Sequence, residues 1–88
     1  MPTLALNSFT TPEFWARYHA LPTRIQRLAD QKYGLWAGNP RHPSLDFKKV
    51  GKVWSVRVGD HYRALARERA EGFVWFWIGT HEEYNKLV

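Results

Sequence analysis

Three strand-like segments separated by short glycine-containing turns occupy residues 53–78, and they restrict the fold more than any other feature. In the first two segments mainly apolar positions alternate with the positions that hold the arginines, which is the pattern of a β-strand. The segments are residues 53–58, 62–68 and 73–78, and the turns are Gly59-Asp60 and Glu71-Gly72. Such short turns join neighbouring antiparallel strands. This part of the chain therefore predicts consecutive hairpins in one antiparallel sheet.

Alternation also divides the side chains of this sheet between two faces. One face receives Trp54, Val56, Val58, Tyr62, Ala64 and Ala66, and the other receives Val53, Ser55, Arg57, Arg63, Leu65 and Arg67. Residues 73–78, with the sequence FVWFWI, are apolar at every position and predict a central strand covered on both faces. We expect helices on the first face and projecting arginines on the second.

Two helices are predicted before these strands. The first starts at Thr11-Pro12-Glu13, where Thr is the N-cap, Pro the first helical residue and Glu part of the first turn. The second starts at Pro22 and ends before the loop of residues 38–43. Their apolar faces are expected in the core rather than in a base-stacking surface. These faces comprise Phe14, Tyr18 and Leu21 in the first helix and Ile25, Leu28, Ala29, Tyr33 and Trp36 in the second.

Three shorter elements complete the predicted fold. Residues 4–9 and 45–49 are expected to be strands, the latter joined to residues 53–58 by the turn Val50-Gly51-Lys52. A capping box at residues 80–83 starts a short C-terminal helical turn. We expect one α+β domain over residues 1–88, of order β-α-α-β-β-β plus that turn. Its two helices pack on a mostly antiparallel four-stranded sheet.

The positive charge of the chain is concentrated in one segment. Residues 41–69 hold eight basic and three acidic residues, a net charge of +5, while the other residues hold five of each. Such a concentration attracts polyanions, although a solvated surface that happens to be rich in Lys and Arg has the same composition. The candidate RNA-binding residues are Lys48, Lys49, Lys52, Arg57 and Arg67.

Several chemistries are disfavoured by what the sequence lacks. The absence of cysteine excludes a disulfide framework, a thiolate nucleophile and a cysteine zinc site. Residues 81–85 are a near miss of the zinc motif H-E-x-x-H, because Asn85 stands at the second ligand position. No apolar run reaches the about 18 residues of a membrane span, and the start of the chain lacks a signal-peptide pattern. We therefore expect no metal, no cofactor, no membrane association and a cytoplasmic location.

Five side chains suited to RNA chemistry are expected to meet on the second sheet face or along its edge. They are Lys48, Arg57, Arg63, His81 and Tyr84. RNA is cleaved by its own 2′-OH when a base removes the hydroxyl proton, cations hold the phosphate and an acid protonates the leaving oxygen. Arginine grips a phosphate through two parallel N–H bonds, and histidine, with a pKa of about 6.5, exchanges protons near neutral pH.

Each of these residues also has an ordinary structural explanation. Arg57 and Arg63 could be exposed strand residues, and Tyr84 a core residue. His81 could be a helix-start residue, where the positive end of the helix disfavours an imidazolium. The combination favours a nucleic-acid site, whereas no single member does. Because Arg63 is expected to point away from the core, its replacement is predicted to cost little stability.

An ordered set of short motifs resembles the RelE/ParE superfamily of small bacterial toxins from type II toxin–antitoxin systems. The resemblance covers nearly the whole chain. The motifs are Leu21-Pro22, residues 39–45 (NPRHPSL), Phe47-Lys48, residues 54–59 (WSVRVG), Tyr62-Arg63-Ala64-Leu65, and residues 78–81 (IGTH) with Tyr84. It implies a RelE-like fold and a cognate antitoxin partner.

The RelE branch cleaves messenger RNA in the ribosomal A site, so the resemblance implies catalytic roles for Arg63, His81 and Tyr84. Arg63 matches an arginine that contacts the scissile phosphate, and Lys48 matches a basic residue before the hairpin. His81 and Tyr84 resemble a C-terminal His/Tyr pair, although two residues separate them here and some members have them adjacent. A glutamate that acts as base in some members has no clear match, since Asp46 is near but out of register.

The favoured function is a metal-independent, ribosome-dependent mRNA endoribonuclease toxin. Its expected partners are an antitoxin, in a toxin–antitoxin hetero-oligomer, and the ribosome with its mRNA. The ParE branch shares the fold, lacks this catalytic set and inhibits DNA gyrase. A gyrase inhibitor, which is a protein-binding module and no enzyme, is therefore the alternative. An inactive RNA-binding relic is a third interpretation.

Overall fold

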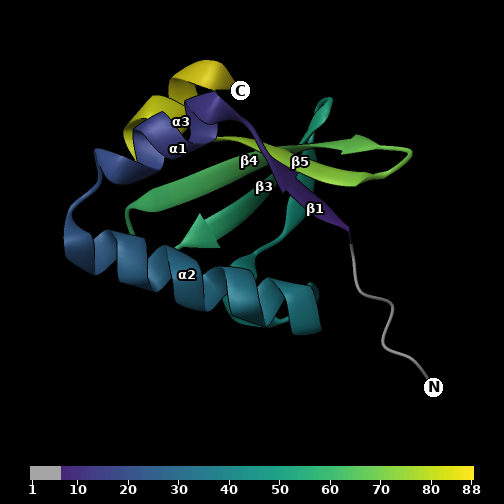
Figure 1. The fold of residues 1–88 in the computed structure, drawn as a ribbon, viewed down its shortest axis with the longest axis horizontal. Helices are drawn as coiled ribbons and strands as arrows, with labels where there is room; N and C mark the ends of the chain where they lie inside the picture. Colours follow the sequence, from purple (N-terminus) through teal and green to yellow (C-terminus); the bar gives the residue numbers. More distant parts are fainter. Residues whose placement is uncertain (1–6) are drawn as a thin grey trace.

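Five strands form one mixed sheet in the computed structural model, which describes residues 7–88 (Figure 1). The strands are β1 Ser8–Thr10, β2 Lys48–Val50, β3 Val53–Val58, β4 Tyr62–Arg69 and β5 Gly72–Thr80, in the spatial order β1-β5-β4-β3-β2. Neighbours pair antiparallel except for β1, which runs parallel to β5. The predicted hairpins and the α+β class are confirmed. The sheet has five strands rather than the four of the predicted order, because the short strand β2 also joins it by pairing with β3.

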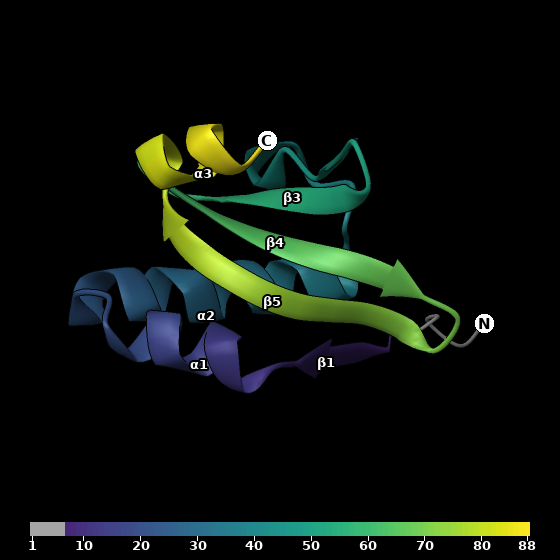
Figure 2. The same ribbon diagram turned by 90° about the horizontal axis from the view of Figure 1, so that it is seen from above.

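Three α-helices cover the two faces of this sheet. Helices α1 (Pro12–His19) and α2 (Thr23–Gly38) lie on one side, and α3 (His81–Leu87) lies on the other (Figure 2). The predicted N-cap of α1 is confirmed, because Thr11 Oγ1 accepts a hydrogen bond of 3.2 Å from the backbone N–H of Phe14. The capping box of α3 is also present. Within the described residues, no helix has the length and apolar composition needed to cross a membrane.

The larger core lies between the sheet and α2. Trp36 is 1% exposed and makes edge-to-face contacts with Phe73 and Trp75, with ring centroids 5.5 and 5.2 Å apart. Such contacts add about 0.5–1.5 kcal/mol per pair to the burial of the rings. Tyr33, expected in this core, is instead 50% exposed. The reason is that its ring lines an open groove between α1 and α2.

A smaller core lies on the other face of the sheet, beneath α3. Its buried members are Leu65, Trp77 and Tyr84, with Val53 and Phe76 packed against them. A register shift pairs Leu65 with Trp77 and the next residue, Ala66, with Trp75, so Phe76 is an extra residue in β5. The shift lets two consecutive aromatic residues of β5 join this cluster. The prediction that residues 73–78 are covered on both faces is confirmed.

The chain before β2 departs from the predicted strand over residues 45–49. Pro43 starts a 3₁₀ turn, η1 (Pro43–Leu45), which buries Leu45 completely. Asp46 then adopts a left-handed conformation with φ of 43° and ψ of 47°, and the strand begins only at Lys48. The predicted strand over residues 4–9 falls partly outside the described residues, and the described strand starts at Ser8.

Candidate functional site

Two arginines lie side by side on the sheet face that α1 and α2 leave open. Arg57 of β3 pairs directly with Arg63 of β4, across a turn in which Gly59 takes a left-handed φ of 70°. Like charges in opposite positions destabilise a sheet. Each arginine is therefore balanced by its own carboxylate, Arg57 by Asp60 at 3.4 Å and Arg63 by Asp46 at 3.3 Å. The register thus places two arginines next to each other even though their mutual repulsion has to be offset by the two carboxylates.

Arg63 is held by a network of hydrogen bonds beneath α3. Its Nε donates to Ser55 Oγ at 2.6 Å, Nη2 to the backbone oxygen of Asp46 at 3.0 Å, and Nη1 to Asp46 Oδ2 at 3.3 Å. Its guanidinium carbon also lies 5.1 Å from the ring centre of Tyr84. The residue is only 6% exposed. The expectation that Arg63 is a surface residue is therefore wrong, because α3 and the segment before β2 cover it, and we now expect its replacement to cost stability.

Lys48 joins this network through the same carboxylate. Its Nζ lies 3.3 Å from Asp46 Oδ2, and its position in β2 is opposite Ser55, on the Arg63 face of the sheet. Partial burial acts to raise the pKa of Asp46. The hydrogen bond and charge of Lys48, together with those of Arg63, outweigh it and hold that pKa below its usual value. Asp46 is consequently an anion at neutral pH, bound between two cations.

His81 and Tyr84 stack on each other at the start of α3. Their ring centroids are 5.5 Å apart with an interplanar angle of 19°. Tyr84 is 6% exposed, so its ring supports both His81 and Arg63 from within the smaller core. The backbone N–H of His81 donates to the carbonyl oxygen of His61 at 2.7 Å, while its Nδ1 is buried with no hydrogen-bond partner among the described residues. A buried polar atom without a partner costs about 1–3 kcal/mol, so stability alone does not explain a histidine at this position.

A small polar hollow connects the arginines with the histidine. It has a volume of about 120 Å³ and is lined by Arg57, Gly59, Asp60, Tyr62, Arg63 and His81. Cations on one wall and a proton-exchanging ring on another are the groups that phosphodiester chemistry requires. Among the described residues, no group of three or more His, Asp or Glu side chains is placed to hold a metal ion.

The remaining predicted RNA-binding residues are distributed differently. Arg67 lies on the Arg63 face, further along β4, with its guanidinium 4.0 Å above the ring of Phe76. Lys52 lies in the turn between β2 and β3. Lys49 pairs with Trp54, and alternation therefore points it away from Lys48, towards the other face. The structure thus gathers Lys48, Arg57, Arg63, His81 and Tyr84, and leaves Lys49 outside the group.

Two members of the site were not assigned a role from sequence, namely Ser55 and Asp46. Ser55 is fully buried yet polar, and its hydroxyl accepts the shortest hydrogen bond of Arg63. The only sequence signal was a small polar residue on the arginine face of an otherwise apolar strand. Asp46 reaches Arg63 across 17 positions of the chain through an unusual backbone conformation, which local pattern does not reveal.

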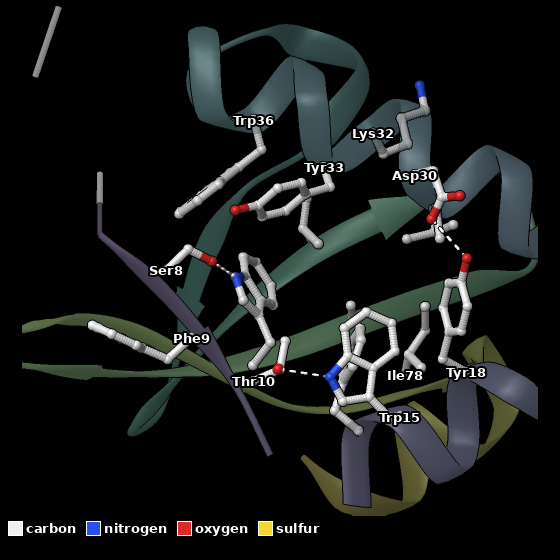
Figure 3. A pocket seen from close by; sticks show the side chains of 16 residues that line it. Ser8, Phe9, Thr10, Trp15, Tyr18, Asp30, Lys32, Tyr33, Trp36 and Ile78 are labelled. Carbon is white, nitrogen blue, oxygen red and sulfur yellow. Dashed lines mark hydrogen bonds between the residues drawn. The ribbon is translucent and has the colours of Figure 1, made fainter. Parts of the chain in front are cut away.

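A larger, mainly apolar groove of about 390 Å³ opens on the opposite side of the sheet (Figure 3). Helices α1 and α2 form its walls, and the hydrogen bond of 2.7 Å from the Tyr18 hydroxyl to Asp30 bridges them. That bond, more than burial or the Asp30 charge, raises the pKa of Tyr18. The exposed aromatic residues Phe9, Trp15 and Tyr33 line the groove. Among the described residues that line the groove, Lys32 is the one basic side chain. The groove therefore suits an apolar ligand better than a nucleic-acid backbone.

Solved structures of toxins and toxin–antitoxin complexes share this fold. The RelB–RelE antitoxin–toxin complex from Methanococcus jannaschii matches with a TM-score of 0.69 and 13% identity over 91% of this chain and 98% of that chain. The toxin–antitoxin complex RelBE2 from Mycobacterium tuberculosis matches with a TM-score of 0.67 and 19% identity, over 89% of this chain and 100% of that chain. The isolated RelE toxin of E. coli matches with a TM-score of 0.64 and 12% identity, over 94% of this chain and 95% of that chain. The fold is therefore RelE-like, that of small toxin domains.

A match to a family model identifies the family of the chain. The model described as the ParE-like toxin domain matches residues 23–86. The chain therefore belongs to the ParE-like toxin domain family of the RelE/ParE superfamily, as the motifs in its sequence indicated. A comparison with curated proteins finds no match.

Proposed function

We propose that this protein is the toxin of a toxin–antitoxin pair and that it cleaves messenger RNA on the ribosome. The observation that carries the proposal is the arrangement of Arg63, which is buried in a network with Lys48 and opens onto the same hollow as Arg57 and His81. Two arginines opposite each other in the sheet, with a histidine beside them, supply the cations and the proton-transfer group that phosphodiester cleavage needs.

The proposed reaction uses the 2′-OH of the RNA as the nucleophile. Arg63 and Lys48 hold the scissile phosphate and stabilise the charge that develops on it. His81 exchanges the proton that must leave the 2′-OH or reach the departing 5′-oxygen. Tyr84 keeps the imidazole and the guanidinium in place through contacts with its ring. Attack of the 2′-oxygen on phosphorus breaks the P–O5′ bond, leaving a 2′,3′-cyclic phosphate and a 5′-OH.

A gyrase inhibitor is the second candidate, because the matching family model is described as ParE-like. Controlled expression in a bacterial host separates the two functions. The nuclease produces discrete cuts in translated mRNA without a DNA-damage response. Induction of that response with intact transcripts would instead support inhibition of gyrase.

Binding to single-stranded RNA is expected to depend strongly on salt. Each neutralised phosphate contributes about 0.7 to the slope of log affinity against log salt, so contacts by Lys48, Arg57 and Arg63 predict a slope near −2. Titrations at several salt concentrations measure it. Arg57→Ala should reduce the slope by about 0.7. Arg24→Ala, which removes an exposed charge from α2 on the opposite side of the sheet, should leave it unchanged. A salt-insensitive interaction would contradict the electrostatic argument.

A cognate antitoxin is expected to cover the basic face, with acidic or apolar residues in contact with Arg57 and Arg63. The reason is that a toxic anion-binding site must be blocked in the resting cell. The structure of the complex, or protection of β3 and β4 from hydrogen exchange, tests this. A partner seated only in the groove between α1 and α2, with the hollow beside Arg63 left open, would mean that inhibition works in another way.

A further inference from the structure

Asp46 has a left-handed backbone conformation that is uncommon for a residue with a side chain. It is the one non-glycine residue with positive φ among the described residues, at 43°. Aspartate tolerates the left-handed region better than most residues, yet it adopts that region only when the surroundings impose it. Here the neighbours impose it. Leu45 is fully buried, and Phe47 stacks on Trp54 with ring centroids 4.7 Å apart. Both flanking side chains enter the helix-side core, while the Asp46 side chain turns to the opposite face.

The Asp46 carboxylate lies where a phosphate oxygen would bind. Its Oδ2 is 3.3 Å from Lys48 Nζ and 3.3 Å from Arg63 Nη1, and the side chain is 44% exposed. A carboxylate that bridges two cations and stays accessible to solvent can be displaced by another anion. The same cations are the proposed ligands of the scissile phosphate. The aspartate and the phosphate therefore compete for one position.

The placement of Arg63 does not depend on this carboxylate. Ser55 Oγ accepts from its Nε at 2.6 Å, and the backbone oxygen of Asp46 accepts from its Nη2 at 3.0 Å. The stacked ring of Tyr84 fixes the remaining face. None of these three contacts uses the carboxylate, so we expect them to persist when it is removed. The carboxylate consequently adds little to the orientation of Arg63 but neutralises the side that faces an incoming anion.

We propose that Asp46 is an internal competitor of the phosphate, which lowers the affinity of the Lys48–Arg63 site for isolated anions. The inference rests on the proposed function, because it takes these two residues as phosphate ligands. A free phosphate or mononucleotide has no other contact with the protein to help it displace the carboxylate, which is tethered beside the two cations. A longer strand is held at the same time by Arg57, so its local concentration at the site is high enough to displace Asp46. Asp46 thus lowers the affinity for every anion by a similar factor, and we expect only an extended polyanion to keep enough affinity to occupy the site.

Removal of the carboxylate tests this directly. The probe is a short fluorescein-labelled RNA with 2′-O-methyl groups, which lacks the nucleophile and therefore reports binding without cleavage. Asp46→Asn tolerates the left-handed backbone, and Asp46→Gly adopts it freely. Both retain the backbone oxygen that holds Arg63. Each should bind the probe roughly tenfold more tightly than wild type, as expected for removal of one nearby like charge. Inorganic phosphate should show a similar gain.

The matched control is Asp30→Asn, which makes the same change in net charge on α2, where Asp30 accepts a hydrogen bond from Tyr18. It should alter the affinity by less than about twofold, because Asp30 is exposed to solvent on the other side of the sheet and salt screens such a charge. Unchanged or weaker binding by folded Asp46→Asn and Asp46→Gly would overturn the inference, and so would an equal gain in Asp30→Asn. Cleavage of unmodified mRNA is measured separately. If no variant cleaves and the Asp46 variants still bind more tightly, the nuclease proposal fails while this inference stands.

Discussion

Arg63→Ala should abolish most of the cleavage activity and also destabilise the protein. Loss of one donor to the charge that develops in the transition state typically lowers the rate by about 10²–10³. The substitution also leaves the fully buried Ser55 hydroxyl without its partner, at a cost of about 1–3 kcal/mol. For a domain of this size, each kcal/mol lowers Tm by roughly 4–8 °C. Thermal unfolding and cleavage assays on the purified variant measure the two effects.

Two further variants separate catalysis from stability. Arg63→Lys keeps the charge but loses the two-pronged geometry, so it should recover part of both properties. Arg57→Ala is the matched stability control, because Arg57 occupies the opposite position in the sheet and its side chain is 47% exposed. Its loss should change stability by no more than about 0.5 kcal/mol. If Arg63→Ala is folded at the assay temperature and as toxic as wild type, the proposed mechanism is wrong and gyrase inhibition becomes the better explanation.

His81→Ala should lower cleavage by about 10²–10⁴-fold while the protein stays folded, because general acid–base groups contribute effects of that size. The buried Nδ1 has no partner among the described residues, so its removal breaks no side-chain hydrogen bond there. Alanine also suits the first turn of a helix. The rate of transcript cleavage by the purified, folded variant is the measurement.

His61→Ala is the control for this substitution. His61 is exposed, and it contacts His81 through its backbone carbonyl, which alanine retains. Its cleavage rate should equal that of wild type. A folded His81→Ala protein that cleaves at the wild-type rate would reduce His81 to a helix-start residue. Tyr84 would then be the next candidate for the proton transfer.

Most of the fold could be predicted from the sequence because its signals are local. Alternation in β3 and β4 specified which residues face the helices, and the turn at Gly59 set Arg57 opposite Arg63. Thr11 and Thr80 marked the starts of α1 and α3. The sequence did not reveal that β2 begins three residues later than expected. Burial of Leu45 in the core makes the chain turn there, and that burial depends on residues distant in sequence.

The candidate site was predicted in its members but not in its environment. Alternation placed Arg63 on the correct face, and the expectation that this face is exposed there was wrong. Coverage by α3 depends on how Tyr84 packs against Leu65 and Trp77, which are far apart in the sequence. The contact with Asp46 depends on a left-handed residue that no motif indicates. Sequence pattern therefore identifies which charges share a face, whereas their burial and partners follow from the tertiary packing.

The most direct test of the central claim is to map the ends of a defined mRNA in reconstituted translation with the purified protein. The claim predicts discrete cuts that require ribosomes and leave 2′,3′-cyclic phosphate ends, as expected when the 2′-OH attacks the phosphate. The cuts should weaken partly with folded Arg63→Lys and strongly with folded His81→Ala. Intact mRNA with the wild-type protein, or identical cuts with both variants, would contradict the claim that this face of the sheet is a nuclease site.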